Sequence, residues 1–141
     1  MTSADDLEPW LQTPAQGDLP EITVERLRRH FSLTYKLGEE QVDFMIKSSA
    51  QSLLAVFETA RQIFEKDAPD QAALVRMSHS LKGLLLNMGE PGWADIARSM
   101  EFAARAGEAH DYSLPVKAVH KAALAVMEYG QASSSAEKTV R

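Results

Sequence analysis

Apolar residues recur along most of this 141-residue chain at the three- and four-residue intervals of an amphipathic helix. Thr23 is a suitable N-cap for the first such segment, and Gly38, Gly89 and Gly107 stand where helices should end. No strand-like alternation between hairpin turns interrupts this pattern. The chain is therefore predicted to be all-α, with helices at about residues 23–37, 39–66, 67–88, 93–106 and 113–130.

The connections between the long helices are short, which favours antiparallel packing of neighbours. We therefore expect an antiparallel up-down-up-down four-helix bundle with an additional N-terminal helix. Small side chains at residues 48–50 interrupt the apolar stripe of the second helix, and we expect a neighbouring helix to come close there, with room for Leu84 or Leu85. Asp67 is the expected N-cap of the third helix, with Pro69 in its first turn.

The composition of the chain changes at both ends of the helical region. Residues 1–21 hold proline, glycine and acidic residues without sustained periodicity, and we expect an irregular arm there. Trp10 and Leu11 either pin this arm to the bundle or remain free of it. Residues 131–141 are serine-rich and polar, which is typical of a disordered tail. The expected folded domain is therefore residues 22–130.

The third predicted helix holds the candidate chemistry. At about 100° per residue, His79 projects away from the apolar stripe of this helix, so its imidazole should face water. Neutral imidazole is a good nucleophile near pH 7, because its unperturbed pKa is about 6.5. Lys82 lies on the flank of the same face, and Arg76 lies one turn before His79 and adds weaker positive potential. Gly83 costs the helix about 1 kcal/mol relative to alanine, and it clears space beside His79.

Three apolar residues share this outer face with the histidine. Leu86 lies about 20° from the direction of His79, Val75 about 40° to the other side, and Ala72 near the same line. Two interpretations are open. Either another part of the chain covers this strip, such as the N-terminal arm, or the strip is exposed and marks a protein-binding site.

The sequence His-Ser-Leu-Lys-Gly at residues 79–83, followed by Asn87 and Gly89, resembles the signature of histidine phosphotransfer (HPt) domains. These domains are helical bundles that relay phosphoryl groups between receiver-domain aspartates in two-component phosphorelays. The resemblance runs from about residue 39 to residue 108, and more loosely to Tyr129. The family usually has small residues directly after the glycine, whereas this chain has two leucines there.

The resemblance implies a role for each candidate residue. His79 would accept a phosphoryl group from a receiver aspartate and pass it to another receiver. Lys82, and more weakly Arg76, would pair with the phosphoryl oxygens, while Gly83 would give access. The expected partners are response-regulator receiver domains or a hybrid histidine kinase. The chain needs no cofactor of its own, because the receiver brings the Mg²⁺ and the acidic pocket.

Three other functions remain open on the sequence. The same bundle could bind a receiver or a kinase without transferring phosphate. It could also be a detached phosphoacceptor domain of a chemotaxis-type histidine kinase, phosphorylated by an ATP-binding domain supplied in trans. A structural bundle without a signalling role is the third alternative.

Several classes of site have no support in the sequence. No Gly-rich phosphate loop is present, so the chain should not bind ATP or phosphorylate itself. No histidine pair at four-residue spacing and no Glu-x-x-His sequence occurs, so no metal site is expected. The remaining histidines, His30, His110 and His120, look incidental.

Composition limits the partners and the compartment. The net charge of −5 argues against nucleic-acid binding and leaves protein partners open. No run approaches the roughly 20 apolar residues of a membrane span, and the N-terminus has no hydrophobic signal segment. The absence of cysteine excludes disulfides and thiolate chemistry and fits a reducing cytoplasm. We therefore expect a cytoplasmic protein without membrane contact.

Overall fold

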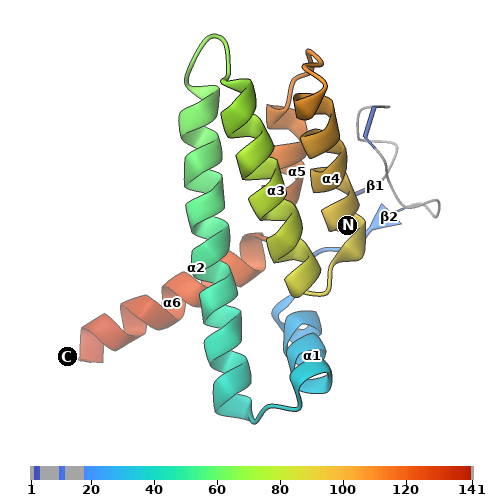
Figure 1. Cartoon of the computed structure of the whole chain (residues 1–141). Coiled ribbons are helices and arrows are strands. Elements are labelled where there is room, and N and C mark those ends of the chain that lie inside the picture. Colours follow the sequence, from blue (N-terminus) through green and yellow to red (C-terminus); the bar gives the residue numbers. More distant parts are fainter. Residues whose placement is uncertain (1, 4–9, 12–17, 141) are drawn as a thin grey trace.

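The computed structural model describes residues 2–3, 10–11 and 18–140, with the backbone alone at residues 2, 3, 18 and 133–140. The predicted all-α class is confirmed, since six helices make up nearly all of the regular structure in these ranges (Figure 1). Among the described residues, one pair of two-residue strands lies at the N-terminal end. The elements are β1 Thr2–Ser3, β2 Asp18–Leu19, α1 Val24–Tyr35, α2 Glu39–Phe64, α3 Gln71–Asn87, α4 Pro91–Arg105, α5 Ser113–Ala122 and α6 Leu124–Val140.

The N-terminal arm is pinned to the helices where the structure describes it. The Trp10 ring stacks on the His110 ring, with 4.1 Å between centroids and 7° between planes, and Leu11 is buried. Strands β1 and β2 pair in antiparallel orientation, so this part of the arm has some regular structure. We expected an irregular arm over residues 1–21. Within that range, residues 1, 4–9 and 12–17 lie outside the described residues.

Side-chain caps set the first residues of two helices, α1 and α3. The Thr23 hydroxyl accepts the Arg26 N–H at 3.1 Å and begins α1, as predicted. The predicted cap of α3 was wrong by one turn, because Asp70 rather than Asp67 accepts the N–H groups of the first helical turn. Proline disfavours helical backbone in the residue before it, so the helix begins after Pro69 and not around it.

Helix α4 begins two residues earlier than the pattern indicated. Pro91 is its first residue, a position where proline has no hydrogen bond to lose. The preceding Gly89 has φ +77°, a left-handed conformation that ends α3. Gly107 ends α4 in the same way, with φ +71°.

The single helix expected at residues 113–130 is two helices, α5 and α6, which meet at Ala123. The Ile22 N–H donates to the Ala122 carbonyl at 2.9 Å, which takes this oxygen out of the regular helical pattern. The N–H of Val126, four residues on, bonds instead to the Ala123 carbonyl. A distant segment of the chain therefore breaks the helix where the local sequence gives no stop signal.

Helix α6 continues to Val140 and so includes residues 131–140, for which the composition predicted a disordered tail. This segment contains alanine, glutamine, glutamate and lysine but no glycine or proline after Gly130. These residue types favour helix where another helix precedes them.

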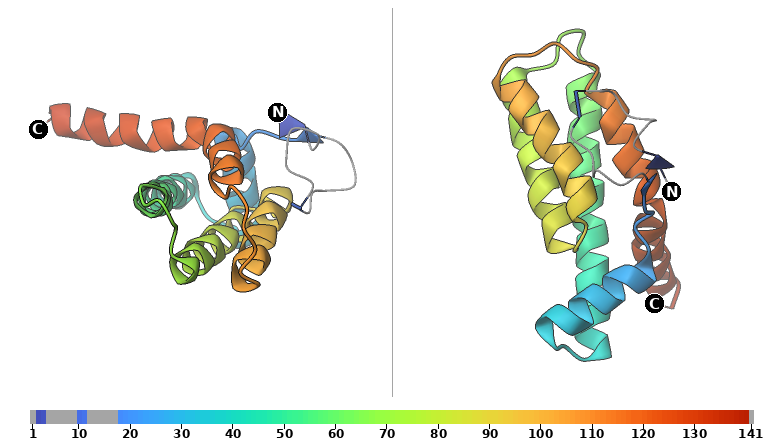
Figure 2. Two further views of the ribbon diagram at one scale, coloured as in Figure 1. Left: turned by 90° about the horizontal axis from the view of Figure 1, so that it is seen from above. Right: turned by 90° about the vertical axis from the view of Figure 1, so that its right-hand side faces the viewer.

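The helices pack around one hydrophobic core. In Figures 1 and 2, α3 lies between α2 and α4, α5 lies behind them, and α1 crosses the lower end of α2. The largest fully buried side chains come from α1 to α4 and from the segment before α1, and include Leu19, Ile22, Phe31, Ile46, Leu53, Leu81, Leu85, Trp93 and Ile96. None of the described helices is long and apolar enough to cross a bilayer.

A neighbouring helix does come close to the small side chains at residues 48–50, and that helix is α6. A Cβ placed on Gly130 would lie 2.6 Å from the Ala50 Cβ, which is too close for two carbon atoms. The glycine therefore lets α6 cross α2 at close range. Leu84 or Leu85 was expected near this gap; Leu85 is fully buried within the core, and Leu84 is partly buried against it.

Candidate functional site

His79 lies in the middle of α3 with 64% of its side chain exposed. In the same helix, the side chains of Met77, Ser78 and Leu81 are buried. The imidazole therefore faces outward from the core, where the helical wheel placed it. In the described part of the chain, its Nε2 atom has no hydrogen-bond partner.

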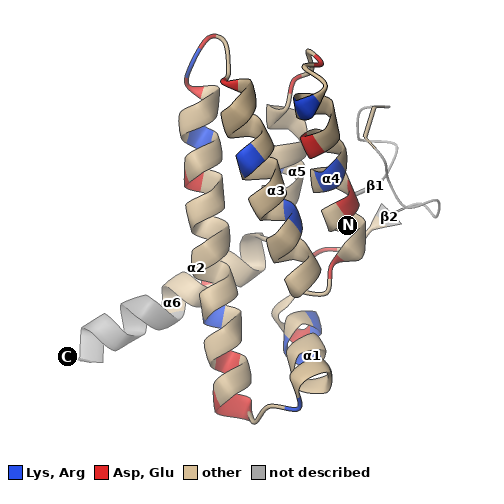
Figure 3. Cartoon of the chain, in the orientation of Figure 1, with Lys and Arg blue, Asp and Glu red and all other residues tan. Residues whose placement is uncertain are grey.

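A buried carboxylate from the next helix holds the other ring nitrogen. Glu101 of α4 has only 4% of its side chain exposed, and its Oε2 lies 3.1 Å from Nδ1 of His79. The Lys82 ammonium donates to Oε1 at 2.9 Å, and the Arg105 guanidinium donates to Oε2 at 2.7 Å. Figure 3 shows acidic and basic residues alternating along α4 beside the basic residues of α3.

The three hydrogen bonds determine the charge of Glu101. Burial by itself would raise the pKa of this carboxyl, but the bonds from Arg105, Lys82 and His79 outweigh burial and lower the pKa to about 2. Glu101 is therefore ionised at neutral pH and can only accept hydrogen bonds. The Nδ1 atom of a neutral His79 must then carry the proton, which leaves the lone pair of Nε2 free and exposed.

Gly83 leaves open space one turn after His79. A Cβ built on Gly83 would meet no atom within 4 Å. Leu86, one turn further along, is 54% exposed, and Ala72 is exposed as well. Val75 is half-buried and packs against the core. Trp10 of the N-terminal arm stacks on His110.

The two basic residues nearest to His79 in sequence lie on opposite flanks of it. Lys82 and Leu86 line a hollow of about 270 Å³ together with Ala94 and Arg98 of α4. Arg76 lines a different hollow of about 230 Å³ between α2 and α3. Lys82 is therefore joined to the His79 cluster through Glu101, whereas Arg76 faces the other side of α3.

Asn87 and Gly89, which follow the His-Ser-Leu-Lys-Gly sequence, have a structural role. The Tyr35 hydroxyl of α1 donates to Asn87 Oδ1 at 3.1 Å, and His30 Nε2 lies 3.1 Å from the Asn87 carbonyl oxygen. A Cβ on Gly89 would lie 2.5 Å from Nδ1 of His30, so glycine is required both for its φ and for this contact. His30, which looked incidental, therefore secures α1 against the end of α3.

Sequence reasoning did not select Glu101 or Arg105. The sequence signal that could have identified Glu101 was the presence of a charged residue within the apolar stripe of α4, between Met100 and Ala103. A buried acid needs basic partners, and Arg105 supplies one from four residues on. The histidine and lysine partners come from another helix, so the local pattern could not identify them.

Comparison with protein-family models, with curated proteins and with solved structures found no match for this chain. Within the described ranges, no group of three or more histidine, aspartate or glutamate side chains is placed to hold a metal ion. The function therefore has to be argued from the site itself.

Proposed function

We propose that this chain is a histidine-containing phosphotransfer protein, in which His79 accepts a phosphoryl group from a receiver-domain aspartate and relays it to another receiver. One observation carries the proposal. An exposed imidazole is bound at Nδ1 by the ionised Glu101, and its Nε2 is left free beside the space at Gly83. This is the arrangement that a nucleophilic histidine needs, with the reacting nitrogen accessible and the ring held in one orientation.

The chemistry follows from the state of the two ring nitrogens. The Nε2 lone pair attacks the phosphorus of an aspartyl phosphate, forming a P–N bond as the P–O bond breaks. The electron pair of the broken bond leaves on the aspartate carboxylate. Nδ1 keeps its proton, and Glu101 stabilises the positive charge that the phosphorylated ring carries. The phosphoramidate is itself a donor, so the transfer can run in both directions.

Two basic side chains next to Glu101 can stabilise the negative charge of the phosphoryl group. Lys82 and Arg105 each donate to Glu101, and 58% of the Arg105 side chain is exposed. The single negative charge of Glu101 balances one of these two cations, so the cluster has a surplus of positive charge with neutral His79. An incoming phosphoryl group can take hydrogen bonds from both. Arg76 is a weaker candidate for pairing with the phosphoryl oxygens, because it lines the hollow on the other side of α3.

The proposed function also accounts for the organisation of the chain. We take α2, α3, α4 and α5 to be the antiparallel up-down-up-down bundle, with α1 as the additional helix and residues 22–130 as the domain. The short connections at residues 65–70, 88–90 and 106–112 support this arrangement. The receiver partner would bring the Mg²⁺ that the transfer needs, and the protein would act in the cytoplasm, where receivers and hybrid kinases present their aspartates.

The docking surface that we propose surrounds His79. Leu86, Ala72 and the exposed edge of Val75 would contact the apolar surface of the receiver, with Gly83 allowing close approach. Lys82 would lie at the rim next to the reacting nitrogen. Exposed apolar residues beside a charged rim are typical of a protein-binding site.

The test is a phosphotransfer profile with the purified full chain. We expect radiolabelled phosphate to move from at least one phosphorylated receiver to the wild-type chain and to His120→Gln, but not to His79→Gln. The label should be stable in base and labile in acid. Labelling of His79→Gln would contradict the assignment. Binding of receivers without labelling would identify an interaction module, and labelling by a kinase ATP-binding domain alone would identify the chemotaxis-type alternative.

A further inference from the structure

Helix α4 presents an exposed aromatic side chain beside the His79 cluster. Phe102 is 57% exposed, although it is a large apolar residue. It directly follows Glu101, whose carboxylate binds His79, so its Cα lies only about 1.5 Å further along the helix axis. Its side chain projects about 100° from that of Glu101 around the helix. Phe102 therefore lies at the level of the candidate nucleophile, on the outer side of α4.

Arg98 connects Phe102 to helix α3. It precedes Phe102 by four residues, which makes the two side chains neighbours on the helix surface. Arg98 also lines the hollow of about 270 Å³ to which Lys82 and Leu86 contribute from α3. Half of the Arg98 side chain is exposed. The exposed surface therefore continues from α3 across the hollow to Phe102, and this surface, defined by Lys82, Leu86, Arg98 and Phe102, is the α3–α4 face.

The α3–α4 face has an exposed apolar residue on each side of the hollow. Leu86 at 54% and Phe102 at 57% are the most exposed large apolar side chains of these two helices. Neither belongs to the hydrophobic core, which other residues of α3 and α4 fill. Exposed apolar and aromatic side chains next to an arginine are typical of a protein-binding site. The face therefore suits a folded protein with an apolar patch of its own.

The charges of the α3–α4 face favour a partner that carries negative charge. Three basic and two acidic residues lie on or beside it, namely Lys82, Arg98, Arg105, Asp95 and Glu101. One excess positive charge remains with neutral His79, although the whole chain carries −5. Because only 4% of the Glu101 side chain is exposed, a partner meets mainly the basic groups. A receiver that presents an aspartyl phosphate brings the opposite charge to this place.

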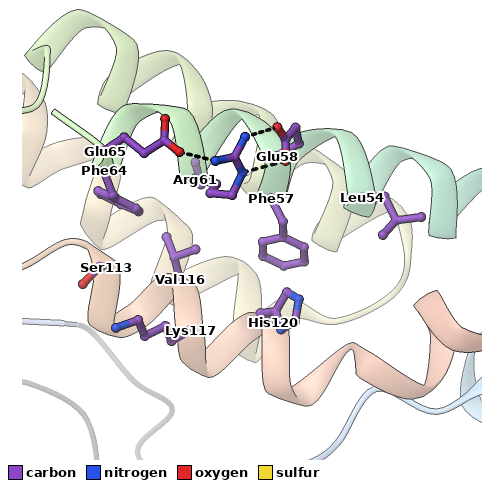
Figure 4. Close-up of a pocket in the computed structure, with 11 residues that line it drawn as sticks. Leu54, Phe57, Glu58, Arg61, Phe64, Glu65, Ser113, Val116, Lys117 and His120 are labelled. Carbon is purple, nitrogen blue, oxygen red and sulfur yellow. Dashed lines mark hydrogen bonds and ion pairs between the residues drawn. The ribbon is translucent and has the colours of Figure 1, made fainter.

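The hollow between α2 and α5 lacks this combination, although its volume is about 740 Å³ (Figure 4). Its lining is partly apolar and includes Phe57, which points toward His120 in Figure 4. The charged residues of the lining balance one another and are Glu58, Arg61, Glu65 and Lys117. That hollow therefore offers no excess positive charge to a phosphorylated partner, and it supplies a residue for a matched control.

We propose that Arg98 and Phe102 of α4 form the second half of the surface that binds the receiver. The inference rests on the proposed phosphotransfer function. Phe102 contacts apolar side chains of the receiver on the α4 side of the hollow, as Leu86 does on the α3 side. Arg98, which donates to Asp95 at 2.6 Å, donates also to an acidic side chain of the receiver. Both residues act on binding and not on the chemical step.

The experiment uses the full chain and the receiver that labels it fastest in the phosphotransfer profile. Initial rates at increasing receiver concentration give KM and the maximal rate separately. Phe102→Ala should raise KM about tenfold, which corresponds to about 1.4 kcal/mol, and should leave the maximal rate unchanged. Phe44→Ala is the matched control, since Phe44 is an exposed phenylalanine of α2 outside this face. Thermal melts of both variants should match the wild type, because both side chains are exposed.

A charge reversal tests Arg98. Arg98→Glu should weaken receiver binding about tenfold in calorimetry, and the loss should shrink as the salt concentration rises. Lys117→Glu makes the same change of charge at the α2–α5 hollow and should alter the affinity much less. Equal losses in the two variants would mean that only the overall charge of the chain matters, which would overturn the role of Arg98.

Two further results would overturn the proposal while phosphotransfer itself stands. The first is a wild-type KM for Phe102→Ala while His79 is labelled normally. The second is a lower maximal rate for Phe102→Ala at an unchanged KM, because Phe102 would then act on the chemistry of His79 rather than on docking. If no receiver labels the wild-type chain, the proposed function fails and this inference fails with it.

Discussion

Nδ1 of His79 lies 3.1 Å from Oε2 of Glu101, so an exposed histidine of α3 takes its orientation from a buried carboxylate of α4. Lys82 and Arg105 donate to the same carboxylate. The basic side chains around the candidate nucleophile are thus arranged by a residue that is almost inaccessible to solvent. Removing or neutralising this residue should change the chemistry of His79 without exposing the core.

The first prediction concerns the tautomer of His79. In Glu101→Ala, Nδ1 loses its acceptor, so neutral His79 should populate both tautomers and labelling by a receiver should slow about tenfold or more, in the range typical of positioning effects. Nitrogen-15 NMR of the imidazole measures the tautomer directly. Glu101→Gln keeps an oxygen acceptor and should retain the proton on Nδ1. An unchanged tautomer in Glu101→Ala would show that the carboxylate does not orient the ring.

The second prediction concerns stability at acidic pH. Because the folded protein lowers the pKa of Glu101 from 4.5 to about 2, ionised Glu101 stabilises the folded state above about pH 4.5. This contribution should be lost as the pH falls toward 2. At about 1.4 kcal/mol per pKa unit it is at most about 3 kcal/mol, and water screens part of it because Arg105 is exposed.

Denaturant unfolding of the wild type and of Glu101→Gln, measured from pH 7 to pH 2, tests this prediction. The difference in unfolding free energy should be largest at neutral pH and should shrink below pH 4.5. Comparing the two proteins removes the contribution of the other carboxyl groups, which titrate in both. A difference that stays constant across this range would mean that Glu101 contributes through packing rather than through its charge.

The third prediction concerns Gly83. No atom lies within 4 Å of a Cβ at this position, so Gly83→Ala should stabilise the helix by up to about 1 kcal/mol. Gly83→Leu should also fold, but its side chain would fill the space beside His79 and slow transfer strongly. Thermal melts and transfer kinetics on both variants check the prediction. Normal transfer by Gly83→Leu would show that the open space has no role in docking.

The fourth prediction concerns the docking surface. Leu86 is 54% exposed, so Leu86→Asp should leave the melting temperature nearly unchanged. We expect receiver binding to weaken at least about tenfold, since truncating a well-packed interface residue costs 1 kcal/mol or more. Leu114→Asp, at a similarly exposed leucine of α5, serves as the matched control. Calorimetry against a cognate receiver measures both, and equal affinities for the two variants would exclude Leu86 from the interface.

The sequence by itself determined the features that depend on local spacing. The helical class, most helix boundaries and the outward direction of His79 follow from apolar periodicity and from capping residues, because both act within one or two turns of the same helix. Gly83 and Leu86 could be placed on the outer face for the same reason. The Asp70 cap and the Pro91 start differ from expectation by only a turn or less.

The tertiary structure decided the features that join distant parts of the chain. Glu101 is 22 residues from His79, and only the packing of α4 against α3 brings its carboxylate to the ring. The division of α5 from α6 depends on the Ile22 N–H, which reaches the Ala122 carbonyl from 100 residues away. Hydrogen bonds and ion pairs of this kind leave no periodic signal in either segment, since each partner is an ordinary residue until the fold places them together.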